Sequence, residues 1–138
     1  MRKAGFLVWL CLCTNVIGFV ATCAIGLYAG QPWRREYRPL SFWATEFMFQ
    51  LWGSLPYVLL IIFLLKSYRT VKQRLVFLFF SFLIVGFGLF DYWYAFFISS
   101  DAQSGLEFLF VPIYQLLGTG IGIGCTVAAG RGHKVDRG

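Results

Sequence analysis

The chain has 138 residues, of which 59% are hydrophobic, 20% aromatic and only 13% charged, and its net charge is +6. An ordinary soluble domain carries about 25% charged residues, and so few charges could not cover this much apolar surface. The composition argues against a soluble domain and predicts one integral membrane domain over residues 1–138. The basic residues flank apolar runs without a nucleic-acid-binding motif, so nucleic acid is not an expected partner.

Four apolar runs follow one another along the chain, each close to the roughly 20 residues that a helix needs to cross a bilayer. The first span is expected at residues 6–28. It is longer than the apolar part of a signal peptide and no A-x-A cleavage site follows it, so we expect it to stay in the protein. The next stretch, "AGQPWRREYRPLS", contains a glycine and two prolines and is predicted to be a loop.

The remaining spans are expected at residues 42–65, 75–98 and 105–129. Pro56 should bend the second span near its middle. The basic stretch "KSYRTVKQR" is predicted to be the loop between the second and third spans, and a short polar loop makes the last two spans an antiparallel hairpin. The predicted fold class is therefore all-α, an integral membrane bundle of four transmembrane helices.

The distribution of charge predicts which way this bundle faces. Nine of the 12 lysines and arginines lie in the amino terminus, the second loop and the tail, which share one side of the membrane. Cytoplasmic loops carry the excess of lysine and arginine, so both termini are predicted to be cytoplasmic. Aromatic residues such as Trp33, Trp43 and Trp93 gather at the opposite boundary, as in an interfacial belt.

The four cysteines, Cys11, Cys13, Cys23 and Cys125, all fall inside predicted spans. None has the spacing of a metal site, and the only histidine, His133, is in the tail. We interpret the cysteines as small apolar core residues. Neither a metal nor a cofactor is expected, and no catalytic motif is found, so the chain is not expected to be an enzyme.

Small residues recur at helical spacing in the first and fourth spans. Inside lipid, helices associate through small residues and polar contacts, because apolar burial does not favour protein over lipid. These faces are predicted to pack against helices of the same bundle or, alternatively, to form a dimer face. The helix-packing candidates are Thr14, Gly18, Thr22, Gly26, Gly118 and Gly122, with a second G-x-x-x-G at Gly120 and Gly124.

Polar residues form a second pattern, in the outer half of the predicted bundle. At about 1.5 Å per residue, Asp91 lies roughly 11 Å inside the third span. A carboxylate at such depth normally faces the bundle interior or water. The candidate polar cavity consists of Glu46, Gln50, Asp91, Glu107, Tyr114 and Gln115, and its candidate ion-pair partners are Arg34, Arg35 and Arg38.

Two interpretations of these polar residues remain open. Ser104 and Glu107 fit a capping box, which would explain the acids near the start of the fourth helix by structure alone. Glu46, Asp91 and Gln115 are not covered by that explanation. They are expected either to form structural ion pairs or to line a functional cavity.

The phrase "DAQSGLEFLFVPIYQ", which follows a span ending in "DYW", resembles small four-span bacterial inner-membrane proteins. The resemblance covers mainly Asp91 to Gln115 and implies a multi-pass protein of the bacterial inner membrane. That group brings no assigned activity, so no functional residue follows from it.

Two functions are consistent with the sequence. The first is a membrane protein without chemistry of its own that binds another membrane protein, as an accessory subunit or an immunity protein does. It follows from the small size, the glycine-rich faces and the absence of catalytic motifs. The alternative is a small oligomeric transporter or an ion- or proton-conducting protein that uses the intramembrane carboxylates. The expected partners are the lipid bilayer and either a membrane protein or further copies of the chain.

Overall fold

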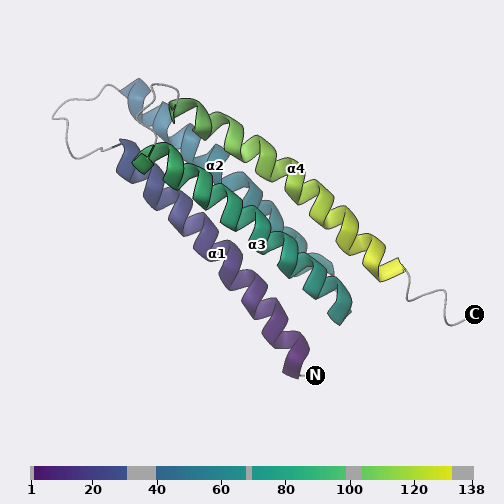
Figure 1. Cartoon of the computed structure of the whole chain (residues 1–138). Coiled ribbons are helices and arrows are strands. Elements are labelled where there is room, and N and C mark those ends of the chain that lie inside the picture. Colours follow the sequence, from purple (N-terminus) through teal and green to yellow (C-terminus); the bar gives the residue numbers. More distant parts are fainter. Residues whose placement is uncertain (1, 31–39, 68–69, 99–103, 132–138) are drawn as a thin grey trace, which may run out of the picture.

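The structure, a computed structural model, describes residues 2–30, 40–67, 70–98 and 104–131, and apart from Thr70 these residues form helices only. The helices are α1 (Arg2–Gly30), α2 (Leu40–Ser67), α3 (Val71–Trp93) and α4 (Ser104–Arg131), and a short π-helix, η2 (Tyr94–Ile98), continues α3. Figure 1 shows one elongated bundle in which the start of α1 and the end of α4 lie at the same end. The predicted all-α bundle of four long helices is therefore confirmed.

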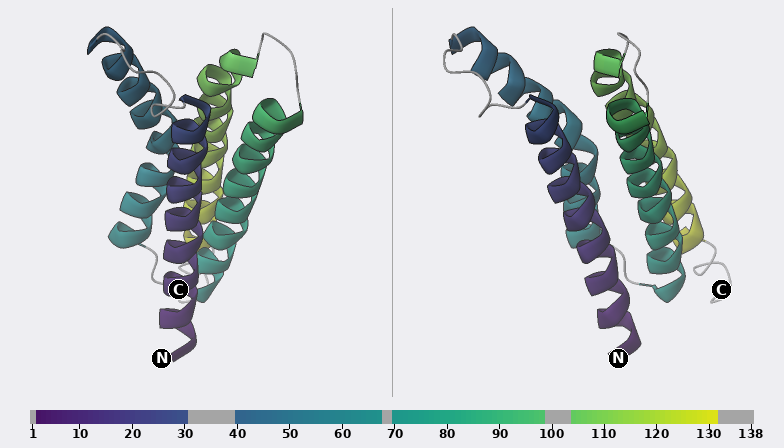
Figure 2. Two further views of the ribbon diagram at one scale, coloured as in Figure 1. Left: turned by 90° about the vertical axis from the view of Figure 1, so that its left-hand side faces the viewer. Right: turned by 60° about the vertical axis from the view of Figure 1, so that its left-hand side comes forward.

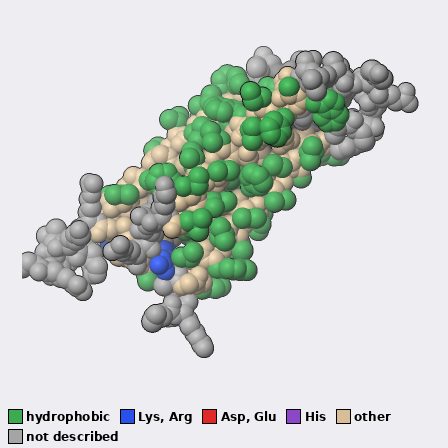
Figure 3. Space-filling view, turned by 180° about the vertical axis from the view of Figure 1, so that it is seen from behind, with side chains coloured by type: hydrophobic (Ala, Val, Ile, Leu, Met, Phe, Trp, Pro, Cys, Tyr) green, Lys and Arg blue, Asp and Glu red, His purple; other side chains and the backbone are tan. Residues whose placement is uncertain are grey.

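All four long helices are long and apolar enough to cross a membrane. The segments with that character are Gly5–Tyr28, Trp43–Leu65, Val71–Trp93 and Leu109–Gly130. Large hydrophobic side chains such as Phe79, Phe82 and Leu117 are more than half exposed on the outside of the bundle. Figure 3 shows such side chains covering one face. An outer surface of this kind suits lipid, as in a multi-pass membrane protein.

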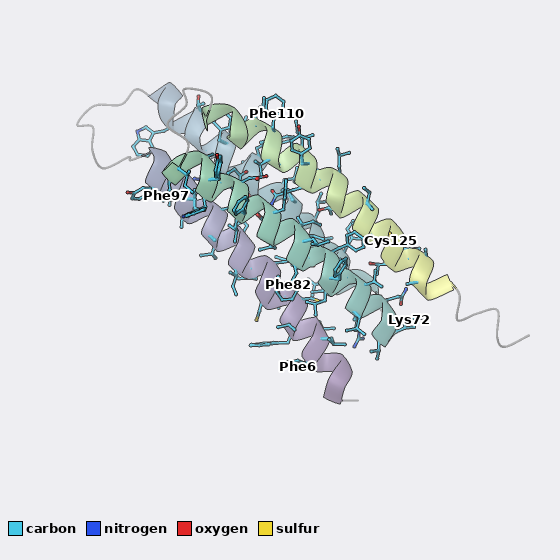
Figure 4. The ribbon with its side chains drawn as sticks, in the orientation of Figure 1. Phe6, Lys72, Phe82, Phe97, Phe110 and Cys125 are labelled. Carbon is cyan, nitrogen blue, oxygen red and sulfur yellow. The ribbon has the colours of Figure 1, made fainter. Side chains whose placement is uncertain are left out.

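Each helix contacts two neighbours closely: α1 and α4 both pack against α2 and α3. Figure 2 shows α1 beside α2 and α3 beside α4. Figure 4 places Lys72, at the start of α3, at the bundle end that also holds the start of α1. The apolar core lies toward this end and consists of Cys11, Leu60, Leu64, Phe77 and Ile84.

The third helix begins earlier than its apolar run indicates. Residues 71–74 were predicted to belong to the basic loop, but α3 starts at Val71. The Thr70 hydroxyl accepts a hydrogen bond from the Gln73 backbone N–H at 3.2 Å, and the Gln73 side-chain oxygen accepts one from the Thr70 N–H at 3.3 Å. This T-x-x-Q capping box satisfies two N–H groups at the helix start, so the polar turn folds as helix.

Candidate functional site

The hydroxyl of Tyr57 lies at the centre of a polar network inside the bundle. Tyr57, from α2, is 0% exposed. Its hydroxyl accepts a hydrogen bond from Thr22 Oγ1 of α1 at 3.2 Å and another from Gln115 Nε2 of α4 at 2.8 Å. The same Gln115 nitrogen donates to the Ile84 carbonyl of α3 at 3.1 Å. Three side chains and one backbone carbonyl therefore connect all four helices through one cluster, which we call the Tyr57 network.

Glycines provide the space that this network fills. A Cβ atom added at Gly88 would lie 3.2 Å from the Tyr57 hydroxyl and would overlap the Gln115 amide. One added at Gly18 would lie 2.8 Å from the Tyr57 ring and 2.9 Å from Val85. A side chain at Gly18 or Gly88 would fit only if the neighbouring residues shifted. The backbones of α1 and α3 therefore approach the Tyr57 network closely because these positions have no side chain.

A second buried polar contact joins α1 to α3. Asn15 Nδ2 donates to the Ser81 hydroxyl at 3.1 Å and to the Cys11 carbonyl, one turn earlier, at 2.8 Å. Both Asn15 and Ser81 are 0% exposed. This pair was not among the residues predicted from the sequence, although an amide within an apolar span is itself a signal of a specific partner.

Two further contacts join helices nearer the bundle surface. Gln50 Nε2 of α2 donates to the Cys23 carbonyl of α1 at 3.4 Å, and a Cβ atom at Gly26 would overlap the Gln50 amide. The Trp52 indole N–H donates to the Leu109 carbonyl of α4 at 3.2 Å. Leu109 precedes Pro112, which has no N–H to give to its own helix. The indole therefore adds a hydrogen bond between α2 and the helical turn of α4 that ends at this proline.

Buried hydroxyl groups elsewhere bond to their own helices. The Thr14 hydroxyl donates to the Leu10 carbonyl at 2.9 Å, and the Thr126 hydroxyl donates to the Gly122 carbonyl at 2.7 Å. Thr119 bonds to the Gln115 carbonyl in the same way, at 2.8 Å. These side chains are satisfied without a ligand, so we assign them to packing.

The predicted helix-packing residues lie where internal packing needs them. Thr14, Gly18, Thr22 and Gly26 are all buried within the bundle. On α4, a Cβ atom at Gly122 would lie 2.8 Å from Phe80, and one at Gly118 would lie 3.4 Å from Ile84. These faces are occupied by neighbours in the same chain, so they are not free to form a dimer face.

The second G-x-x-x-G of α4 points the other way. Gly120 and Gly124 are exposed, and a Cβ atom at either would have nothing within 4 Å. Because successive residues turn by about 100° around a helix, positions two residues apart lie on nearly opposite faces. One "GTGIGIG" segment therefore provides an inner face for α3 and an outer face on the surface of the bundle.

Two members of the predicted polar cavity, Tyr114 and Gln115, line one groove between α3 and α4, and Gln50 does not line it. Gln115 is part of the Tyr57 network, whereas Gln50 bonds to α1 and Tyr114 is 57% exposed. Asp91 is partly buried on α3. Glu46 and Glu107 belong to α2 and α4, but their side chains lie outside the described part of the chain, as do Arg34, Arg35 and Arg38 altogether.

The chemistry of the network is that of neutral hydrogen-bonding groups. The described hydrogen bonds that join different helices use hydroxyl, amide and indole groups, a thiol, and backbone carbonyls. No group of three histidine, cysteine, aspartate or glutamate residues that could hold a metal occurs among the described residues. Each interhelical hydrogen bond in a membrane contributes on the order of 0.6–2 kcal/mol. The arrangement is suited to fixing one packing of four helices.

Comparison of the chain with models of protein families, with curated proteins and with solved structures found no match. The resemblance of Asp91 to Gln115 to small bacterial inner-membrane proteins therefore stays a prediction.

Proposed function

We propose that this protein is a small multi-pass membrane protein of the bacterial inner membrane, with both termini in the cytoplasm, that acts by binding another membrane protein. Its role is that of an accessory or immunity-type protein, and it performs no chemistry of its own. The observation that carries this proposal is the outer face of α4, where Gly120 and Gly124 lie exposed, one turn apart, with open space in front of both.

This outer face has the character of a helix-binding surface. Leu117 and Ile121, which flank the glycines, are 62% and 61% exposed. Glycines spaced by four residues let another backbone approach closely, and the flanking large side chains then pack around the crossing point. In lipid such close packing supports association even though apolar burial by itself does not.

The interior of the bundle supports the same proposal. The polar groups of the Tyr57 network bond to one another across all four helices. A bundle whose polar groups hold its own helices together offers partners a stable outer surface. Recognition then depends on the shape of that surface, and the glycine pair supplies the distinctive shape on α4.

The test is a purification of the tagged full chain from native membranes in mild detergent. The wild type is compared with Gly120→Leu, Gly124→Leu and the matched control Gly86→Leu. Gly86, on α3, is also exposed with nothing within 4 Å of an added Cβ atom. We expect the two α4 variants to lose a co-purifying membrane protein that the wild type and the Gly86 variant retain.

Equal recovery of the partner by all four proteins would overturn the proposed face. A particle made only of this chain would favour the alternative, an oligomeric transporter. In that case cation and proton flux would be measured in vesicles that contain the wild type or Asp91→Asn. Asp91 is chosen because it is the one carboxylate of the predicted cavity whose side chain lies in the described part of the chain. Wild-type flux in this variant would remove Asp91 from the mechanism.

A further inference from the structure

Positive charge gathers at the end of the bundle that holds the start of α1. The basic residues of the described helices all lie close to helix ends there: Arg2, Lys3, Lys66, Lys72, Arg74 and Arg131. The acidic residues of the described helices, Glu46, Asp91 and Glu107, belong to the other half of the bundle. The basic side chains visible in Figure 3 also lie at this end. Within the described part of the chain, this positive charge therefore has no acid beside it.

The helices α3 and α4 approach each other closely at the same end. A Cβ atom added at Gly130 would overlap the Gln73 amide, so the last turn of α4 lies against the first turn of α3. Lys72, next to Gln73, is exposed, and Arg131 is the last residue of α4. Figure 4 shows Lys72 beside this end of α4. We call this place, defined by Lys72 and Arg131, the basic corner. The start of α3 adds the positive end of its helix dipole.

An apolar groove of about 280 Å³ lies between the same two helices, farther from the bundle end. We call it the α3/α4 groove. Phe80, Leu83 and Phe87 line it from α3, and Tyr114 and Gly118 line it from α4. Leu83, Phe87 and Tyr114 are between 51% and 57% exposed, so the groove opens on the outer surface of the bundle. Its walls are mainly apolar and suit a hydrocarbon chain.

The basic corner and the groove lie on one face of α3. Because successive residues turn by about 100°, Lys72 and Leu83 lie within about 20° of each other around the helix axis. At about 1.5 Å per residue, the groove begins at Phe80, roughly 12 Å from Lys72. One leaflet provides half of a hydrocarbon core that is about 30 Å thick. A lipid with its headgroup at Lys72 would therefore have its acyl chains at the depth of the groove.

We propose that the basic corner and the α3/α4 groove form one binding site for an anionic phospholipid. The phosphate lies beside Lys72 and the end of α4, and one acyl chain lies in the groove. A zwitterionic lipid carries its own cation beside the phosphate and is attracted less to an uncompensated positive charge. The proposal rests on the placement of the bundle in a membrane. It is independent of the partner face, because Gly120 and Gly124 do not line the groove.

The probes are dioleoyl phosphatidylglycerol, which is anionic, and dioleoyl phosphatidylcholine, which has the same acyl chains and no net charge. The thermal unfolding of the full chain in an uncharged detergent is measured against the mole fraction of each lipid in the micelles. We expect a saturable rise in the unfolding temperature with phosphatidylglycerol. Phosphatidylcholine should need a mole fraction higher by about fivefold, the ratio that corresponds to one lysine near an anionic lipid surface.

Three variants locate the headgroup. Lys72→Gln should lose the preference for phosphatidylglycerol, and Lys72→Arg should keep it because the positive charge is retained. Lys3→Gln is the matched control, because it removes one charge at the same end of the bundle but from α1. This control should keep the preference. Loss of the preference in Lys3→Gln with its retention in Lys72→Gln would overturn the basic corner as the site.

Two further comparisons locate the acyl chain. Gly118→Leu fills the groove, because Gly118 lines it and an added Cβ atom would already contact Ile84 at 3.4 Å. It should lose the saturable shift, whereas Gly120→Leu, with nothing within 4 Å of an added Cβ atom, should keep it. Dihexanoyl phosphatidylglycerol tests the same point in the wild type, since its chains end before the groove. It should give no saturable shift at mole fractions where the dioleoyl lipid saturates.

The wild type alone is sufficient to overturn the proposal, so no variant has to fold. Equal half-saturation by phosphatidylglycerol and phosphatidylcholine would overturn the headgroup site and leave a groove that any lipid fills. Equal shifts with the dihexanoyl and dioleoyl lipids would overturn the role of the groove. Absence of any saturable shift would overturn both. None of these results depends on a co-purifying partner, so they are distinct from failure of the proposed function.

Discussion

The hydroxyl of Tyr57 and the amide nitrogen of Gln115, 58 residues apart in the chain, lie 2.8 Å from each other at the centre of the bundle. This hydrogen bond links α2 to α4, and Thr22 and Ile84 extend it to α1 and α3. In a membrane the apolar side chains of the bundle gain little from leaving lipid. The directional hydrogen bonds of the Tyr57 network therefore select one among the possible packings of four apolar helices.

Removing the Tyr57 hydroxyl should destabilise the bundle. Tyr57→Phe leaves the Thr22 hydroxyl and one N–H of Gln115 without their acceptor. We expect the free energy of unfolding to fall by about 1–2 kcal/mol, the magnitude of interhelical hydrogen bonds in membrane proteins. The measurement is reversible unfolding in mixed micelles with increasing denaturing detergent.

The matched control for that change is Tyr114→Phe. It removes the same atom from a tyrosine that is 57% exposed on the surface of α4. Its free energy of unfolding should stay within about 0.5 kcal/mol of the wild type, as for most surface substitutions. If both variants lost the same stability, the network would have no special role in the packing.

The glycines of α3 provide a second test. Gly88→Ala places a methyl group against the Gln115 amide and 3.2 Å from the Tyr57 hydroxyl, whereas Gly86→Ala places one in open space. Overpacking a filled interior costs about 1–3 kcal/mol, but alanine in an exposed helix position is favoured over glycine by roughly 1 kcal/mol. We expect opposite signs for the two changes in unfolding free energy, measured in one assay. Stabilisation by both would show that α3 does not approach α4 as closely as the structure has it.

Much of the fold followed from the sequence because its signals are long and local. Four apolar runs of spanning length predict four helices. The structure extends each predicted span by only a few residues at its ends, except at Ile98, where the predicted and observed ends coincide. The exception at the start of α3 has a clear local cause. Thr70 and Gln73 form a capping box within a stretch that was interpreted from its charge alone as a loop.

The site was harder to predict, because it depends on which faces of different helices meet. Gln50 and Gln115 were grouped by depth, yet Gln50 bonds to α1 while Gln115 bonds to α2 and α3. Depth along a span can be counted from sequence, but rotation about the helix axis relative to a neighbour cannot. Asn15 was missed although an amide within an apolar span is itself a signal of a specific partner. Its pairing with Ser81 of α3 depends on the same rotation about the helix axes.

The two glycine faces of α4 should separate folding from partner binding. A Cβ atom at Gly122 would lie 2.8 Å from Phe80, so Gly122→Leu should lower the unfolding free energy by about 1–3 kcal/mol or more. Gly124→Leu points into open space and should leave stability unchanged or slightly raised. Unfolding in mixed micelles and recovery of the partner are measured on the same preparations. If Gly122→Leu kept full stability and lost only the partner, Gly122 would belong to the partner-binding face, and the assignment of the inner and outer faces would be wrong.

The capping box of α3 gives a prediction outside the bundle interior. Thr70→Ala removes the oxygen that accepts the Gln73 backbone N–H at 3.2 Å, and it also removes a contact with the Gln73 side chain at 3.1 Å. Loss of such a cap costs about 0.5–2 kcal/mol, and amide hydrogen exchange of the first turn, Val71 to Arg74, should become faster. Thr70→Ser keeps the hydroxyl and should restore both stability and protection. Equal exchange rates in the alanine and serine variants would mean that the packing of Phe77 and its neighbours, rather than the cap, fixes where α3 begins.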